Sequence, residues 1–239
     1  MLQETDVVDW YDLETASGST AVTEKTGGVN GSIVGATWVT GGPTNISNGL
    51  NFTPSGQYVE VANDYDLSAG TMFVWCIIDN FLAEGNNDFI FDFGAGGGEG
   101  TIATLSAGTV FSRTRFGGDT TVTASGLSVG TTYLFVHTWD QADNGGNGQV
   151  ELFLNGVSQG TANGSGTIVD QNHNLVAGRR AGLNDRYFDG KIFQMGLLNR
   201  RITSTEVAEI FNSGDGITYS ALFGSSPTAQ PFSQAVIIA

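Results

Sequence analysis

The stretch that most constrains the fold runs from residue 133 to residue 161 and reads YLFVHTWD, QADNGGNG, QVELFLNGVSQGT. Residues 133–139 and 150–154 are rich in β-branched and aromatic side chains, a composition typical of half-buried strands. The Asp, Asn and Gly residues between them tolerate the left-handed backbone that tight loops need. Asn155-Gly156, between two extended runs, indicates a type I′ hairpin. We therefore predict three consecutive antiparallel strands in the middle of a large sheet.

The same pattern of short apolar runs and turn residues recurs along the chain. Gly fills 35 of 239 positions and only 14% of residues are charged, against about 25% in typical domains. Many short strands joined by tight turns would have this composition, which favours an all-β, two-sheet antiparallel sandwich. The other strands that we predict are 6–13, 31–34, 37–40, 50–52, 57–61, 70–79, 89–93, 101–105, 110–116 and 120–124.

One short helix is predicted near the C-terminus. Thr203-Ser204-Thr205-Glu206 is a capping box, in which the Thr203 hydroxyl accepts from the Glu206 amide and Glu206 reaches back. The apolar stripe that follows consists of Val207, Ile210 and Phe211. Gly214 can end the helix. We expect this helix to plug one end of the sandwich.

A series of motifs in a fixed order extends this prediction. They are WYDL at 10–13, LNF at 50–52, YVEV at 58–61, MFVW at 72–75, HTWD at 137–140, VELFLNGV at 150–157, VAGR at 176–179, FDGKI at 188–192, LNR at 198–200 and TEV at 205–207. Together they resemble the laminin G-like branch of the concanavalin A-like jelly rolls, over about residues 6 to 213. The resemblance implies one jelly-roll domain, residues 1–216, but says little about function because this fold carries many activities.

Charge and hydropathy exclude several partners. The net charge of −15 argues against nucleic acid and anionic membranes, whose binding relies on Lys and Arg. No run is long enough to span a membrane, and the N-terminus lacks the basic and apolar regions of a secretory signal. Relatives implied by the resemblance are mostly extracellular. A bacteriophage or other virion protein, or a chain whose signal has been removed, would reconcile these observations; otherwise we expect a cytoplasmic protein.

The tail, residues 217–239, has no charged side chain and ends in an apolar Val-Ile-Ile run. A disordered tail is normally polar and charged. Two alternatives follow: a last strand on the chain's own sheet, or a docking arm that adds to a neighbouring subunit's sheet edge. The second alternative predicts an oligomer or larger assembly through this segment.

Catalytic motifs are not evident. Retaining glycosidases of the family that the chain resembles carry E-x-D-x-x-E or E-x-D-x-E on a central strand, which holds two carboxylates about 5 Å apart. The near match Glu4-Thr5-Asp6-Val7-Val8-Asp9 ends in Asp and lies on an expected edge strand. His137, predicted to be a core residue, and His173 lack the spacing of a triad or metal site. We therefore predict no catalytic residues and no pair of acids inside the sandwich. The alternative is a glycoside hydrolase or polysaccharide lyase.

Calcium is a possible but not required ligand. Asp140, Asp143, Asn144 and Asn147 crowd one loop and offer hard oxygen ligands, although any hairpin loop favours the same residue types. The resemblance also implies an acidic calcium ligand directly after the FDGKI strand. That position is Phe193 in this chain.

Two loops are candidates for ligand binding because a rigid sandwich presents its loops to solvent. The candidate residues are Asp140, Asp143 and Asn144 in one loop and Arg179, Arg180, Asn184, Asp185, Arg186 and Tyr187 in the other. Arg and Tyr can stack on sugars and form forked hydrogen bonds, although ordinary surface ion pairs would use the same residues. We predict a non-catalytic recognition or structural module. It would bind glycan at a cell surface, on a fibre or decoration protein, or dock to neighbouring subunits of a virion.

Overall fold

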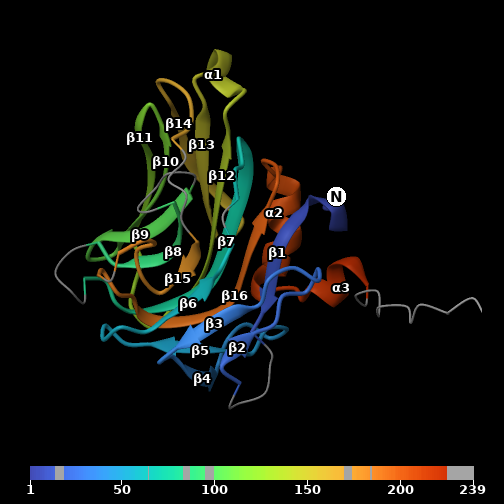
Figure 1. Cartoon of the computed structure of the whole chain (residues 1–239), viewed down its shortest axis with the longest axis vertical. Helices are drawn as coiled ribbons and strands as arrows, with labels where there is room; N and C mark the ends of the chain where they lie inside the picture. The colour runs from blue at the N-terminus through green and yellow to red at the C-terminus, as the bar shows by residue number, and fades with distance from the viewer. Residues whose placement is uncertain are drawn as a thin grey trace, which may run out of the picture.

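The chain folds into two antiparallel sheets packed face to face, which confirms the predicted all-β sandwich (Figure 1). The computed structural model describes residues 1–13, 19–63, 65–82, 87–94, 100–169, 174–183 and 185–224. Sheet A runs in the order β14 (Val157–Asn163), β13 (Gln149–Leu154), β12 (Thr132–Asp140), β7 (Ala69–Asn80), β16 (Asp189–Leu198), β5 (Asn48–Phe52) and β4 (Thr37–Thr40), and β1 (Val7–Asp12) also pairs with β16.

Sheet B covers the other side of the core. Its order is β11 (Gly118–Ser125), β10 (Thr109–Phe116), β9 (Gly100–Ser106), β8 (Phe89–Phe93), β15 (Leu175–Ala177), β6 (Tyr58–Val61), β3 (Gly31–Val34) and β2 (Ala21–Val22). Alternating side chains of both sheets form the main core, with fully buried rings such as those of Phe91, Phe135 and Trp139. The pattern of period two in the sequence therefore corresponds to one inward face per strand.

The predicted hairpin is confirmed, but its place in the sheet is different. Asn155 (φ 49°) and Gly156 (φ 81°) both have the left-handed backbone of a type I′ turn. However, β14 is an edge strand, and the centre of sheet A is formed by β7 and β16. Those two strands are far apart in the chain, so no local pattern could reveal their pairing.

A second core covers the outer face of sheet A. It includes Trp10, Phe73 and Trp75, which helices α2 (Ser204–Phe211) and α3 (Tyr219–Phe223) cover. Figure 1 shows both helices on the side of sheet A that faces away from sheet B. Because β7 is buried on both faces, its sequence is almost continuously apolar rather than alternating.

The helix α2 begins as predicted but lies elsewhere. Thr203 Oγ1 accepts from the Glu206 amide at 3.3 Å, and Glu206 Oε2 accepts from the Thr203 amide at 2.9 Å. The left-handed residue that ends the helix is Asn212 (φ 45°), and Gly214 belongs to the 3-10 turn η2 (Asn212–Gly214) that follows. The Phe211 ring stacks on Trp75, with centroids 5.8 Å apart. The helix therefore covers the face of sheet A and does not plug an end of the sandwich.

The first part of the tail packs onto the domain as a helix. Tyr219 in α3 is buried, its amide donates to Asp12 Oδ2 at 3.0 Å, and its hydroxyl donates to Glu4 Oε1 at 2.5 Å. The alternative that predicted a last strand is therefore wrong for residues 217–224. Residues 225–239, which carry the Val-Ile-Ile run, lie outside the described part of the chain. Of the helices that are described, none is long and apolar enough to cross a membrane.

Candidate functional site

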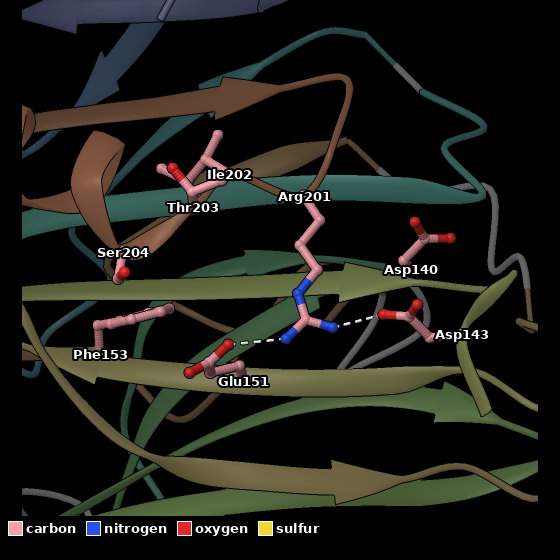
Figure 2. Close-up of a pocket in the computed structure, with 8 residues that line it drawn as sticks. All are labelled: Asp140, Asp143, Glu151, Phe153, Arg201, Ile202, Thr203 and Ser204. Atoms are coloured by element: carbon pink, nitrogen blue, oxygen red, sulfur yellow. Dashed lines mark hydrogen bonds and ion pairs between the residues drawn. The ribbon is translucent and has the colours of Figure 1, made fainter. Parts of the chain in front are cut away.

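A groove of about 430 Å³ opens on the outer face of sheet A, between β12, β13 and the start of α2 (Figure 2). We call it the Arg201 groove. Its lining residues are Asp140, Asp143, Glu151, Phe153, Arg201, Ile202, Thr203 and Ser204. Two of these, Asp140 and Asp143, belong to the first predicted loop, whereas the other six were not predicted. The alternation of β13 could have indicated Glu151, because it points away from the main core.

Arg201 organises the groove through its guanidinium. Its Nη1 donates to Asp143 Oδ2 at 2.5 Å and to Gln149 Oε1 at 2.9 Å, and its Nη2 donates to Glu151 Oε2 at 2.7 Å. Figure 2 shows the side chain reaching between Asp143 and Glu151. Ser158 Oγ also donates to Glu151, at 2.6 Å. The planar fork of arginine therefore holds both carboxylates in defined orientations.

The rim of the groove carries carboxylate oxygens that point to solvent. Asp140 Oδ1 accepts from the Ala142 amide at 2.8 Å, which closes the turn before α1 (Asp143–Gly146). Within that short helix, Asn144 (φ 53°) and Gly145 (φ 68°) have a left-handed backbone. Within the described ranges, no protein group donates to Asp140 Oδ2 or to Asp143 Oδ1. These two oxygens are available as acceptors for a ligand.

The residues proposed for calcium do not fit that ion. Asp143 is held by the Arg201 guanidinium, which supplies the positive charge that calcium would bring. The side-chain amides of Asn144 and Asn147 donate to the carbonyls of Gly164 and Asn144, at 3.2 and 3.1 Å. Over the described ranges, no three His, Cys, Asp or Glu side chains come together as a metal site. We derive no function from calcium at this loop.

Phe193, at the position where the family resemblance implied an acidic ligand, is also unsuited to a metal. Its ring is fully buried in the second core, against Gly42 and Gly49. A β-carbon added at Gly42 would lie 2.5 Å from that ring. An aromatic side chain therefore fills the space at this position.

The second predicted loop lies over the outer face of sheet B, apart from the Arg201 groove. The Arg179 guanidinium stacks over Tyr58 at 4.1 Å and pairs with Glu60 at 3.4 Å. Arg180 pairs with Asp185 at 2.5 Å. The two predicted loops therefore lie at separate candidate sites, one at the groove on sheet A and the other over the outer face of sheet B.

Other members of this loop complete the same surface. Arg186 (φ 57°) has its guanidinium 5.8 Å from the centre of the Phe89 ring, and Tyr187 is half-buried beside it in the chain. Asn184, the remaining predicted residue, lies outside the described part of the chain. Arg113 and Arg115 of β10 extend the surface, and both pair with Asp119 at 2.7 Å. The Arg179–Glu60 pair joins distant segments, whereas the pairs of Arg113, Arg115 and Arg180 join residues four to six positions apart.

The near match to a glycosidase motif is dispersed in the structure. Glu4 binds the Tyr219 hydroxyl, Asp6 pairs with Arg200 at 2.7 Å, and Asp9 is buried on β1. Asp9 does lie beside Glu24: a β-carbon added at Gly28 would be 3.3 Å from an oxygen of each. The two acids therefore meet beside β1, where Glu24 Oε1 also accepts from the Trp10 amide at 3.0 Å. Both side chains are buried, at 0% and 6% exposure.

The first of the two histidines lies in the core. His137 is fully buried with its Nε2 2.8 Å from Thr114 Oγ1, as predicted for a core residue. Burial lowers the pKa of His137 to about 3, so the ring is neutral at physiological pH. His173 lies outside the described residues.

The two-sheet topology, with a helix over the outer face of one sheet, defines a jelly-roll sandwich of the concanavalin A-like class. The chain belongs to the concanavalin A-like lectin/glucanases superfamily, whose family model matches residues 53–208. This match confirms the resemblance inferred from the motifs. No curated protein matches the chain.

Solved structures with the same fold include toxin binding domains. The botulinum neurotoxin serotype D binding domain is 11% identical with a TM-score of 0.62, and the match covers 87% of this chain and 52% of that chain. The binding domain of Paraclostridial Mosquitocidal Protein 1 is 15% identical with a TM-score of 0.63, and the coverage is 87% and 52%. This chain therefore spans about half the length of the toxin binding domains it matches.

A third neighbour matches over nearly its whole length. It is Domain 4 of AbnA, a GH43 extracellular arabinanase from Geobacillus stearothermophilus, in complex with arabinotriose. It is 15% identical with a TM-score of 0.59, and the match covers 87% of this chain and 98% of that chain. At such identities these neighbours show a shared fold and nothing finer.

Proposed function

We propose that this chain is a non-catalytic module that binds glycan in the Arg201 groove. The observation that carries the proposal is the combination of oriented carboxylates and a hydroxyl around one groove of about 430 Å³. Small-ligand sites commonly have about 300–1,000 Å³. The fold shared with an arabinanase domain in complex with arabinotriose supports the proposal.

The chemistry of the groove suits a sugar. Asp140 and Asp143 offer carboxylate oxygens to sugar hydroxyls, and the Ser204 hydroxyl can donate or accept. Phe153 and Ile202 also line the groove, but both are almost fully buried in the second core, so the exposed lining is mainly polar. Because Arg201 holds Asp143 and the Ala142 amide holds Asp140, binding costs little side-chain entropy.

A glycan array followed by titration of the best ligand tests this proposal. We expect Arg201→Gln to weaken binding by about tenfold or more, because Asp143 and Glu151 lose their charge-assisted partner. Arg180→Gln is the matched control, since it breaks one arginine–carboxylate pair on the other sheet. No binding to any glycan, or equal losses in both variants, would contradict the proposal.

A second candidate function is protein docking in an assembly such as a virion fibre or a capsid decoration. The uncharged, apolar-ended segment 217–239 supports it, because such an end favours association. The two functions are compatible, since the Arg201 groove and this segment are different parts of the chain. In this setting the chain would work outside the cell or on the particle surface.

A further inference from the structure

Charge in the Arg201 groove points to a narrower class of ligand. Three carboxylates, those of Asp140, Asp143 and Glu151, line the groove with a single cation, Arg201. Two negative charges are therefore in excess. We infer that the groove binds sugar units that carry a protonated amine, as in glucosamine oligomers. This inference rests on the proposed function.

The hydrogen bonds of Arg201 exclude an anionic sugar. Its guanidinium already donates to Asp143, Gln149 and Glu151, at 2.5 to 2.9 Å. A sugar carboxylate or sulfate would have to displace one of these acceptors and would face the remaining carboxylates. Like charges brought together in this way destabilise a complex.

The oxygens left over on the rim suit an ammonium group. Asp140 Oδ2 and Asp143 Oδ1 accept no hydrogen bond from the described residues, while their partner oxygens are held by the Ala142 amide and Arg201. A hydrogen bond between ions is roughly twice as strong as one between neutral groups. A protonated amine beside either carboxylate would therefore bind more tightly than a hydroxyl or an acetamide in the same place.

The distribution of charge over the whole molecule also favours a cationic ligand in the groove. The net charge is −15, and five of the nine Lys and Arg residues lie over sheet B, away from the groove. These five are Arg113, Arg115, Arg179, Arg180 and Arg186. The field around the groove is therefore negative and favours the approach of cations, most strongly at low salt.

Titration of the full chain with three sugar trimers tests the inference: glucosamine, N-acetylglucosamine and galacturonic acid. We expect the glucosamine trimer to bind about tenfold more tightly than the acetylated trimer, and to lose affinity as salt screens the charges. The galacturonic acid trimer should bind least. Acetylation removes the positive charge of the amine and keeps the ring, so this pair isolates the effect of charge.

Asp140→Asn provides the decisive variant. Its amide Oδ1 can still accept from the Ala142 amide, so the turn should remain, while one negative charge is lost. We expect affinity for the glucosamine trimer to fall by roughly fivefold and affinity for the acetylated trimer to fall by about twofold at most, because the acetylated sugar loses a hydrogen bond to a charged acceptor but no ion pair. Asp215→Asn is the control, because it removes one charge near the other end of α2 and keeps an acceptor for Thr44.

The outcomes separate this inference from the proposed function. Equal affinity for the amine and acetylated trimers, unaffected by Asp140→Asn, would overturn the inference and leave glycan binding in place. Preference for the galacturonic acid trimer would likewise overturn the inference and leave glycan binding in place. Binding to a lysine-rich peptide but to no sugar would overturn both, since the cation would then come from a protein.

Discussion

Asp9 shows how burial alters the chemistry of one residue. It lies on β1 with no exposed surface, and burial raises the pKa of its carboxyl group to about 6. The hydroxyl of Tyr65 lowers this pKa in part, whereas the charge of Glu24 raises it. The folded state therefore retains a proton on Asp9 that the unfolded chain releases near pH 3.8.

This pKa predicts a dependence of stability on pH. The protonated carboxyl stabilises the fold fully below pH 3.8, and that contribution is lost as the pH rises through about 6. The difference between the two pKa values corresponds to about 3 kcal/mol. Asp9→Asn cannot ionise, so its stability relative to the natural chain should improve by up to that amount between pH 4 and pH 7.5.

Denaturant unfolding of both proteins at the two pH values measures this difference. Asp66→Asn, at an exposed position, serves as the control. If Asp9→Asn and the natural chain differ by the same free energy at both pH values, Asp9 does not titrate as described. The sequence shows that residue 9 is an aspartate. Its burial beside Glu24 depends on a loop that folds back onto β1, so its unusual pKa could not be predicted from the sequence.

At the scale of elements, α2 illustrates the difference between local and long-range information. Its capping box involves residues three positions apart, and its backbone and side-chain hydrogen bonds follow the prediction. The surface that it covers depends instead on Trp75, which is more than a hundred residues earlier in the chain. The start of the helix was therefore predictable and its position was not.

Thr203→Ala should destabilise the protein by about 1 kcal/mol, because the Glu206 amide loses its side-chain acceptor. Thr205→Ala removes a hydroxyl from an exposed position in the same turn and should change stability by much less. Thermal or denaturant unfolding compares the two variants. An equal effect of both would show that the cap does not stabilise this helix.

The strands show the same difference between local and long-range information. The hairpin turn at Asn155-Gly156 is determined by the backbone preferences of two residues, and the structure contains it. Sheet order requires pairing between β7 and β16, whose residues lie more than a hundred positions apart. The patterns therefore predict the strands but not their neighbours.

For the whole molecule, the segment 217–239 decides whether the chain acts alone. Removing 217–239 takes away Tyr219 and Phe223, which pack against Trp10, and should destabilise the protomer by about 3 kcal/mol or more. Removing only 225–239 keeps these contacts. If this segment docks subunits, the shorter deletion should lower the mass in solution while the protomer stays folded.

Light scattering and thermal unfolding of both truncated chains distinguish these effects. A mass in solution that is unchanged by removing 225–239 would contradict the docking proposal. A protomer that is equally stable without residues 217–224 would contradict the role of α3 in the second core.

The fold class, the main strands, the hairpin turn and the helix cap could all be predicted from the sequence. Each of these depends on side-chain period, backbone preference or hydrogen bonds within a few residues. The second core, the burial of Asp9 and the Arg201 groove became visible only in the folded chain. Arg201 meets Asp143 and Glu151 from positions 58 and 50 residues away. Such contacts exist only after the sheets have paired, because packing of distant strands, not local preference, brings those charges together.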